Sequence, residues 1–153
     1  MDLILWRHAE AHDAAEGGVD LERNLTSRGQ KQAARMAAWL DRHLPDSSRI
    51  LCSPAHRTEQ TVMALGRKYK VRAEVGPDGT PAQLLELVQW PQFKASVLVV
   101  GHQPLLGQVV SQLLGMDDPD CSLKKGSVWW LRTKLRDGIP RTSIWTVQNP
   151  DTV

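Results

Sequence analysis

Residues 3–8 read Leu-Ile-Leu-Trp-Arg-His, and residues 97–102 read Val-Leu-Val-Val-Gly-His. In each segment a run of four apolar residues is followed by two further residues, the second of which is histidine. Short, wholly apolar runs are typical of strands buried on both faces of a sheet. Open α/β sheets bind their ligands just beyond the carboxyl ends of such strands. The two segments therefore predict an α/β fold with His8 and His102 on the same edge of its sheet.

Helices and further strands are expected around these two segments. Apolar residues recur at helical spacing over residues 27–44, where Ser27 and Gln30 form a capping box and Pro45 ends the helix. The remaining expected elements are a strand at 50–52, a helix opened by Ser53 and Pro54 with an inner face reaching Tyr69, a strand at 71–75, a turn at 76–79, helices at 81–90 and 104–114, and strands at 127–131 and 143–147.

This alternation predicts a single three-layer α/β/α domain over residues 1–153, with a mainly parallel central sheet covered on both faces. The last two strands, joined through Asp137-Gly138, are expected to form an antiparallel edge pair near the C-terminus. A chain of 153 residues is long enough for one domain with one sizeable core.

The composition excludes several classes of protein. The net charge of +2 gives no reason to expect nucleic-acid or membrane binding. The N-terminus lacks both the basic segment of a signal peptide and the long apolar run of a membrane span. Cys52 and Cys121 lie outside any Cys-x-x-Cys motif, so we expect no framework disulfide and a cytoplasmic location. The oligomeric state is left open.

A third chemical element, Arg57, follows the expected helix start at Ser53. Helix N-termini attract anions through free N–H groups, and a guanidinium adds a fork that suits phosphate. His8, His102 and Arg57 could each have a purely structural role, because strand-end histidines often make only local hydrogen bonds and arginines often form surface ion pairs. Two histidines at equivalent positions, one preceded by Arg7, favour a functional site.

Three motifs together resemble the histidine phosphatase (phosphoglycerate-mutase-like) superfamily: Arg7-His8, residues 53–61 (Ser-Pro-Ala-His-Arg-Thr-Glu-Gln-Thr) and Gly101-His102. The resemblance is strongest to the compact SixA-type phosphohistidine phosphatases, which also have an acid and an arginine before the first helix, as residues 20–26 do here. It implies a phosphatase that needs no metal or other cofactor. The residues it implies are Arg7, His8, Arg57 and His102 as catalytic groups and Arg23, Asp20 and Gln103 as substrate-binding groups.

The sequence departs from the superfamily pattern in two places. Ala9 stands where the superfamily usually has glycine, which narrows the space beside the nucleophile. No carboxylate clearly matches the catalytic glutamate of larger members, and the candidates for a general acid are Asp20, Asp78 and Glu86. Asp20 has two open interpretations: it orients a histidine or the substrate, or it makes a local turn.

Two other chemistries are less well supported. His8 and His12 resemble a metal pair only if they lie on a helix with further ligands, and this stretch is expected to be a loop. Cys52 and Arg57 resemble the motif of cysteine phosphatases, but only four residues separate them instead of five and Pro54 interrupts the phosphate-binding loop.

The implied mechanism starts with attack of His8 on phosphorus, with Arg7, Arg57 and a protonated His102 around the transferred group. Water then hydrolyses the phosphohistidine formed on the enzyme. The missing general acid and the short loops favour phosphohistidine in a protein as the substrate. A small-molecule phosphomonoesterase and a non-catalytic phosphate-binding domain are the alternatives.

Overall fold

The computed structural model describes residues 1–153 and contains one six-stranded sheet in the order β3-β2-β4-β1-β5-β6. The pairs β3–β2, β2–β4 and β4–β1 are parallel, whereas β1–β5 and β5–β6 are antiparallel. The strands are β1 (Asp2–Arg7), β2 (Arg49–Cys52), β3 (Lys70–Val71), β4 (Val97–Gly101), β5 (Val128–Arg136) and β6 (Ile139–Gln148).

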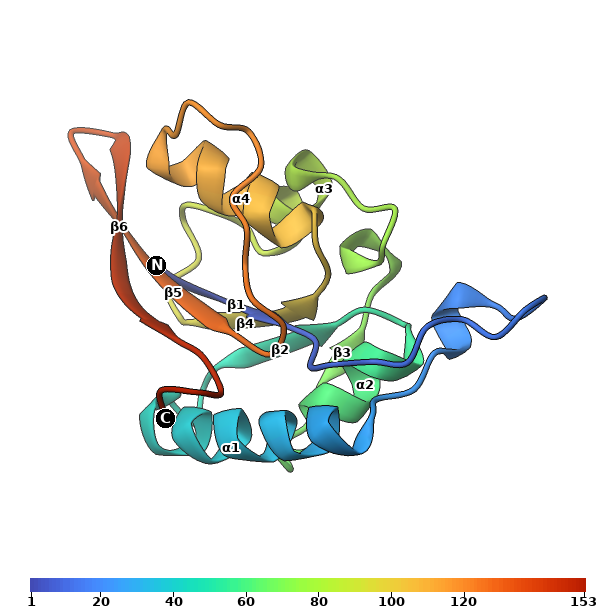
Figure 1. Cartoon of the computed structure of the whole chain (residues 1–153). Helices are drawn as coiled ribbons and strands as arrows, with labels where there is room; N and C mark the ends of the chain where they lie inside the picture. The colour runs from blue at the N-terminus through green and yellow to red at the C-terminus, as the bar shows by residue number, and fades with distance from the viewer.

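Helices cover both faces of this sheet (Figure 1). One face carries α1 (Ser27–His43) and α2 (His56–Met63), and the other carries α3 (Pro81–Leu87) and α4 (Leu105–Leu114). Two short 3-10 turns, η1 (Asp20–Glu22) and η2 (Ala73–Val75), complete the fold. The predicted three-layer architecture is confirmed, including the antiparallel pair near the C-terminus. No helix combines the length and apolarity required of a membrane span.

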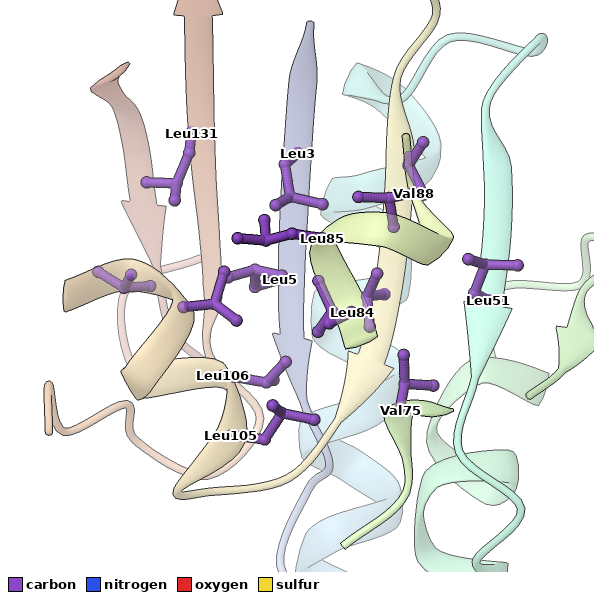
Figure 2. Packing of buried hydrophobic residues seen from close by; sticks show 14 of the residues in the cluster. Leu3, Leu5, Leu51, Val75, Leu84, Leu85, Val88, Leu105, Leu106 and Leu131 are labelled. Carbon is purple, nitrogen blue, oxygen red and sulfur yellow. The ribbon is translucent and has the colours of Figure 1, made fainter. Parts of the chain in front are cut away.

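Side-chain alternation along β1 divides the core into two clusters. Leu3 and Leu5 pack with residues of α3 and α4, whereas Ile4 and Trp6 pack with residues of α1 and α2. Figure 2 shows the first cluster, in which leucines of both helices lie over the sheet. Burial on both faces explains why β1 and β4 have wholly apolar sequences. It also holds the ends of these strands in fixed positions, and the candidate site lies at those ends.

The predicted capping box of the first helix is wrong. The N-cap of α1 is Thr26, whose hydroxyl accepts a hydrogen bond from Gly29 N at 2.9 Å. Gly29 therefore occupies the position that a capping-box glutamine would need. A Cβ atom on Gly29 would overlap the carbonyl of Glu10, so glycine permits close contact between this helix and the loop after β1.

The boundaries of the next elements also differ from the prediction. Ala55 is the N-cap of α2, so Ser53 and Pro54 precede the helix instead of opening it, and the helix ends at Met63. The strand expected at 71–75 is shorter, because the chain leaves β3 and forms the turn η2. That turn buries Val75 in the core cluster against α3 and α4.

Candidate active site

The carboxyl ends of β1 and β4 bring His8 and His102 together. The strands are parallel neighbours in which Arg7 pairs with Gly101, and His8 N donates to Gly101 O at 3.0 Å. The two imidazole ring centres lie 5.4 Å apart. Both side chains are buried. The predicted placement of the two histidines at one edge of the sheet agrees with this geometry.

The segment before β5 closes the same edge. Gly126 N donates to His8 O at 3.0 Å, and Arg7 N donates to Ser127 O at 3.0 Å. The Arg7 side chain donates through Nη1 to Leu123 O at 2.6 Å. These contacts tie both residues of the Arg7-His8 pair to a second part of the chain.

The hydrogen bond of His8 determines which ring nitrogen carries a proton. Nδ1 lies 2.7 Å from the carbonyl oxygen of Ala9, which can only accept, so Nδ1 is protonated. Burial lowers the pKa of His8 to about 4, and the positive charges of Arg57, Arg7 and Arg23 act in the same direction. His8 is therefore neutral near pH 7, with a free lone pair on Nε2. That is the protonation state a nucleophilic histidine requires.

We expect His8 to remain neutral between pH 5 and pH 8, because protonation of the ring begins only as pH falls toward about 4. A plot of kcat/KM against pH should therefore show no loss from His8 protonation near pH 6.5, the ordinary histidine value. Two-bond ¹H–¹⁵N spectra of the ¹⁵N-histidine-labelled protein check this directly. A His8 resonance that titrates between pH 6 and pH 7 would contradict the expectation.

The methyl group of Ala9 packs in a small apolar cluster beside the nucleophile. Ala9 is fully buried and packs with Leu25 and Ala33 in a small cluster beneath the loop. Its N–H donates to Thr61 Oγ1 at 3.1 Å, and that hydroxyl donates to Arg57 O at 2.7 Å. Thr61 therefore links the residue after the nucleophile to the backbone of α2. No such role was expected for Thr61, although it lies one helical turn after Arg57.

Arg57 lies in the first turn of α2, and its side chain is 5% exposed. Its Nη1 donates to Asp20 O at 2.8 Å and its Nη2 to Asp20 Oδ2 at 3.0 Å. Asp20 also accepts from Arg23 Nη1 at 3.1 Å, and Arg23 Nε donates to His12 O at 2.6 Å. These bonds hold the long loop between β1 and α1 against the site.

The pKa of Asp20 determines whether this carboxyl group can act as a general acid. Partial burial raises this pKa, but hydrogen bonds from Arg23 and Arg57 outweigh the burial and lower the pKa overall. Asp20 is therefore ionised near pH 7 and has no proton to give. Glu86 lines a hollow with Trp90 and Lys94 before β4, at the opposite edge of the sheet. Asp78 is exposed and has no side-chain hydrogen bond or ion pair.

Gln103 does not present its amide to the site. Its Nε2 donates to Cys121 O at 2.8 Å and its Oε1 accepts from Gly107 N at 2.8 Å. Both groups are engaged with backbone, so the geometry favours a structural role over the substrate-binding role implied by the resemblance. Cys52 is also unsuited to chemistry, because burial raises the pKa of its thiol to about 12.

The expectation of a protonated His102 is not met. Burial lowers the pKa of His102 to about 3, and the positive charge of Arg57 is the next largest cause. With the charges of the protein alone, His102 is a neutral imidazole. Its Nε2 lies 2.6 Å from Ser53 Oγ, whereas Ser53 was expected to cap a helix.

Four buried side-chain polar atoms in the structure have no hydrogen-bond partner, and all four belong to residues at this edge of the sheet. They are Arg7 Nε, Arg57 Nε, His102 Nδ1 and Ser127 Oγ. Buried polar atoms are nearly always paired, so such a concentration indicates a site for a polar ligand. Two of the atoms belong to guanidinium groups, which bind phosphate well.

Comparison with known proteins agrees with this geometry. A family model described as the histidine phosphatase superfamily (branch 1) matches residues 3–78. The phosphohistidine phosphatase SixA of Escherichia coli is 34% identical over 127 residues, which cover 78% of each chain. The chain belongs to the histidine phosphatase superfamily. A SixA homologue of Haemophilus influenzae is 31% identical over 134 residues, covering 78% of this chain and 80% of the relative.

Solved structures place this histidine phosphatase in the same fold as its relatives. The structure of the protein histidine phosphatase SixA complexed with tungstate matches it with a TM-score of 0.80 and 28% identity. The match covers 99% of this chain and 98% of that one. The superfamily resemblance of the three sequence motifs is therefore confirmed.

Proposed function

We propose that this histidine phosphatase removes phosphate from phosphohistidine in a protein, through a phosphohistidine intermediate on His8. One observation carries the proposal: the buried partnerless atoms gather at the sheet edge where His8 Nε2 has a free lone pair. A phosphoryl group supplies oxygen acceptors for the two guanidinium groups and an electrophilic phosphorus for the lone pair. The two SixA relatives support the same substrate class.

The reaction has two steps. In the first step His8 Nε2 forms a bond to phosphorus while the bond from phosphorus to the substrate nitrogen breaks. The substrate imidazole leaves as a neutral group because its other ring nitrogen already carries a proton, and the electron pair of the broken bond stays on the nitrogen that bore phosphorus. In the second step water attacks phospho-His8, inorganic phosphate departs, and His8 regains its lone pair. Arg7 and Arg57 stabilise negative charge on the equatorial oxygens in both steps.

Asp20 and Arg23 have supporting roles in this proposal. The Asp20 carboxylate holds Arg57 and Arg23 together at the mouth of the site. Arg23 keeps a partly exposed guanidinium there, and its positive charge acts on His8. We assign Arg23 to the approach of the phosphoryl group and Asp20 to the positioning of both arginines.

The absence of a placed general acid favours phosphohistidine over a serine ester. An alkoxide leaving group needs a proton from an acid, and such catalysis contributes about 10²–10⁴-fold. Asp20 is ionised, Glu86 lies at the opposite edge of the sheet, and Asp78 forms no hydrogen bond or ion pair that would position it, so none of the three is a placed acid. A neutral imidazole leaves without this help, because the pKa of its conjugate acid is roughly 6.5.

A protein substrate fits the connections around the site. The chain passes from β2 to α2 and from β4 to α4 through a few residues only, and no inserted domain covers the sheet edge. Two longer connections border this edge, from β1 to α1 and from α4 to β5, and in Figure 1 much of the first extends away from the sheet. A phosphohistidine on the surface of another protein is therefore able to approach.

We expect kcat/KM to be at least about a hundredfold higher for phosphohistidine than for phosphoserine in proteins of similar size, since only the ester lacks its acid. The comparison uses one enzyme preparation, a histidine-containing protein phosphorylated with phosphoramidate, and a phosphoserine protein. Aryl phosphates with leaving groups of graded pKa serve as a control, and their rates should fall steeply as that pKa rises. Preference for a sugar phosphate or for phosphoserine would instead indicate a small-molecule phosphomonoesterase or an overlooked acid.

A further inference from the structure

Ser53 contacts His102 at the centre of the site. Ser53 follows β2 directly, is fully buried, and places Oγ 2.6 Å from His102 Nε2. Its own carbonyl accepts from Thr58 Oγ1 at 2.8 Å, which fixes the backbone on the side of α2. The hydroxyl is therefore held against the imidazole and is shielded from water.

The position of the hydroxyl proton follows from the available partners. Ser53 Oγ also lies 3.5 Å from Ala55 N, which donates to it. The only acceptor in contact with this hydroxyl is His102 Nε2. If Nε2 carried a proton and donated to Oγ, the hydroxyl proton would be buried without an acceptor, at a substantial cost. The hydroxyl therefore donates, and Nε2 accepts.

This direction determines the tautomer of His102. A neutral imidazole whose Nε2 accepts has its proton on Nδ1. His102 follows β4, which lies between β2 and β1 in the sheet. The centre of the His102 ring lies 5.4 Å from that of His8, the nucleophile of the proposed mechanism. His102 Nδ1 is one of the buried atoms without a partner.

We propose that Ser53 is a positioning residue that keeps His102 neutral and protonated on Nδ1, so that His102 donates a hydrogen bond to the phosphoryl group without carrying charge. The second half of this statement rests on the proposed function, whereas the tautomer does not. The arrangement explains how a histidine in a site with three arginines contributes a donor without adding a further positive charge beside His8.

The direct test is a two-bond ¹H–¹⁵N spectrum of ¹⁵N-histidine-labelled protein near pH 7, without substrate. We expect His102 to show a protonated Nδ1 and an unprotonated Nε2, with its signals identified by their loss in His102→Ala. A protonated Nε2 in the wild-type protein would overturn the proposal, whatever the activity. This readout needs no substrate, so it stands apart from the fate of the proposed function.

The kinetic test is Ser53→Ala, with Ser96→Ala as the matched control. Ser96 is also buried and also shares a hydrogen bond with one side chain, Ser48 Oγ at 2.8 Å, but it lies before β4 at the opposite edge. We expect Ser53→Ala to show a mixture of His102 tautomers and a kcat/KM about tenfold below wild type. Ser96→Ala should keep the single tautomer and a kcat/KM within about twofold of wild type. Unchanged kcat/KM in folded Ser53→Ala would overturn the proposal that His102 donates to the phosphoryl group.

If that variant does not fold, Ser53→Cys, which keeps a weak donor of similar size, is compared in its place.

Discussion

Replacing His8 with Ala is expected to abolish turnover of phosphohistidine while leaving the protein folded. Of the two imidazoles at this edge of the sheet, His8 alone has a ring nitrogen with a free lone pair, because His102 Nε2 accepts from Ser53. Loss of a nucleophile in covalent catalysis removes the chemical step and not only part of its rate. His8 belongs to neither large hydrophobic cluster, so its removal costs little core packing. Steady-state release of phosphate and the thermal unfolding midpoint measure the two effects.

His56→Ala is the matched control for this variant. His56 also comes from a superfamily motif and directly precedes Arg57, but its side chain is exposed at the start of α2. We expect its activity to remain within about twofold of wild type. Near-normal activity of folded His8→Ala would disprove the mechanism, and inactivity of His56→Ala would mean that the loss does not single out the nucleophile.

The second large effect is expected for Arg57→Ala, which should lower kcat/KM by about a hundredfold or more. A charge-assisted donor to a transferring group is worth about 2–4 kcal/mol in the transition state. A factor of ten in rate corresponds to about 1.4 kcal/mol. The side chain is nearly fully buried and points a partnerless Nε into the protein, so water does not replace it easily. Arg57→Lys should recover only part of the loss, because lysine keeps the charge without the fork.

Arg67→Ala separates this catalytic loss from the loss of an arginine in general. Arg67, which follows α2, also bonds an aspartate and a backbone carbonyl, but these partners, Asp41 Oδ1 at 3.1 Å and Leu44 O at 3.1 Å, lie at the C-terminal end of α1. We expect its kcat/KM to stay within about twofold, with any effect confined to stability. A drop of less than about threefold for Arg57→Ala would place Arg57 outside the site.

Much of the fold is predictable because short patterns of neighbouring residues determine its strands and helices. The wholly apolar runs of β1 and β4 indicate strands that are buried on both faces. The apolar pattern of α4 predicts a buried helix, and Gly115, which has a φ of 64°, ends it as expected. Helix starts are less predictable, since Thr26 and Ser27 are both good N-caps and the choice depends on contact between Gly29 and the loop after β1. The turn η2 depends on burial of Val75, which is a tertiary contact.

The site shows the same division. His8 and His102 are predictable because strand ends meet at one edge, and Arg57 because helix starts favour anions. The roles of Ser53 and Thr61 depend on hydrogen bonds between segments far apart in the chain, which no local pattern reveals. With the charges of the protein alone, His102 is neutral and not charged as expected, because burial and neighbouring arginines lower its pKa, and both are properties of the folded state.

The central claim is a phosphoryl group carried by His8, and rapid-quench mapping of the first turnover tests it most directly. The enzyme is mixed with a protein bearing ³²P-phosphohistidine, quenched in alkali within milliseconds and digested for mass spectrometry. We predict acid-labile label on His8 that rises and then falls as inorganic phosphate appears. Label on another residue would contradict the mechanism. Release of phosphate in the first turnover without label on the enzyme at any time would also contradict it.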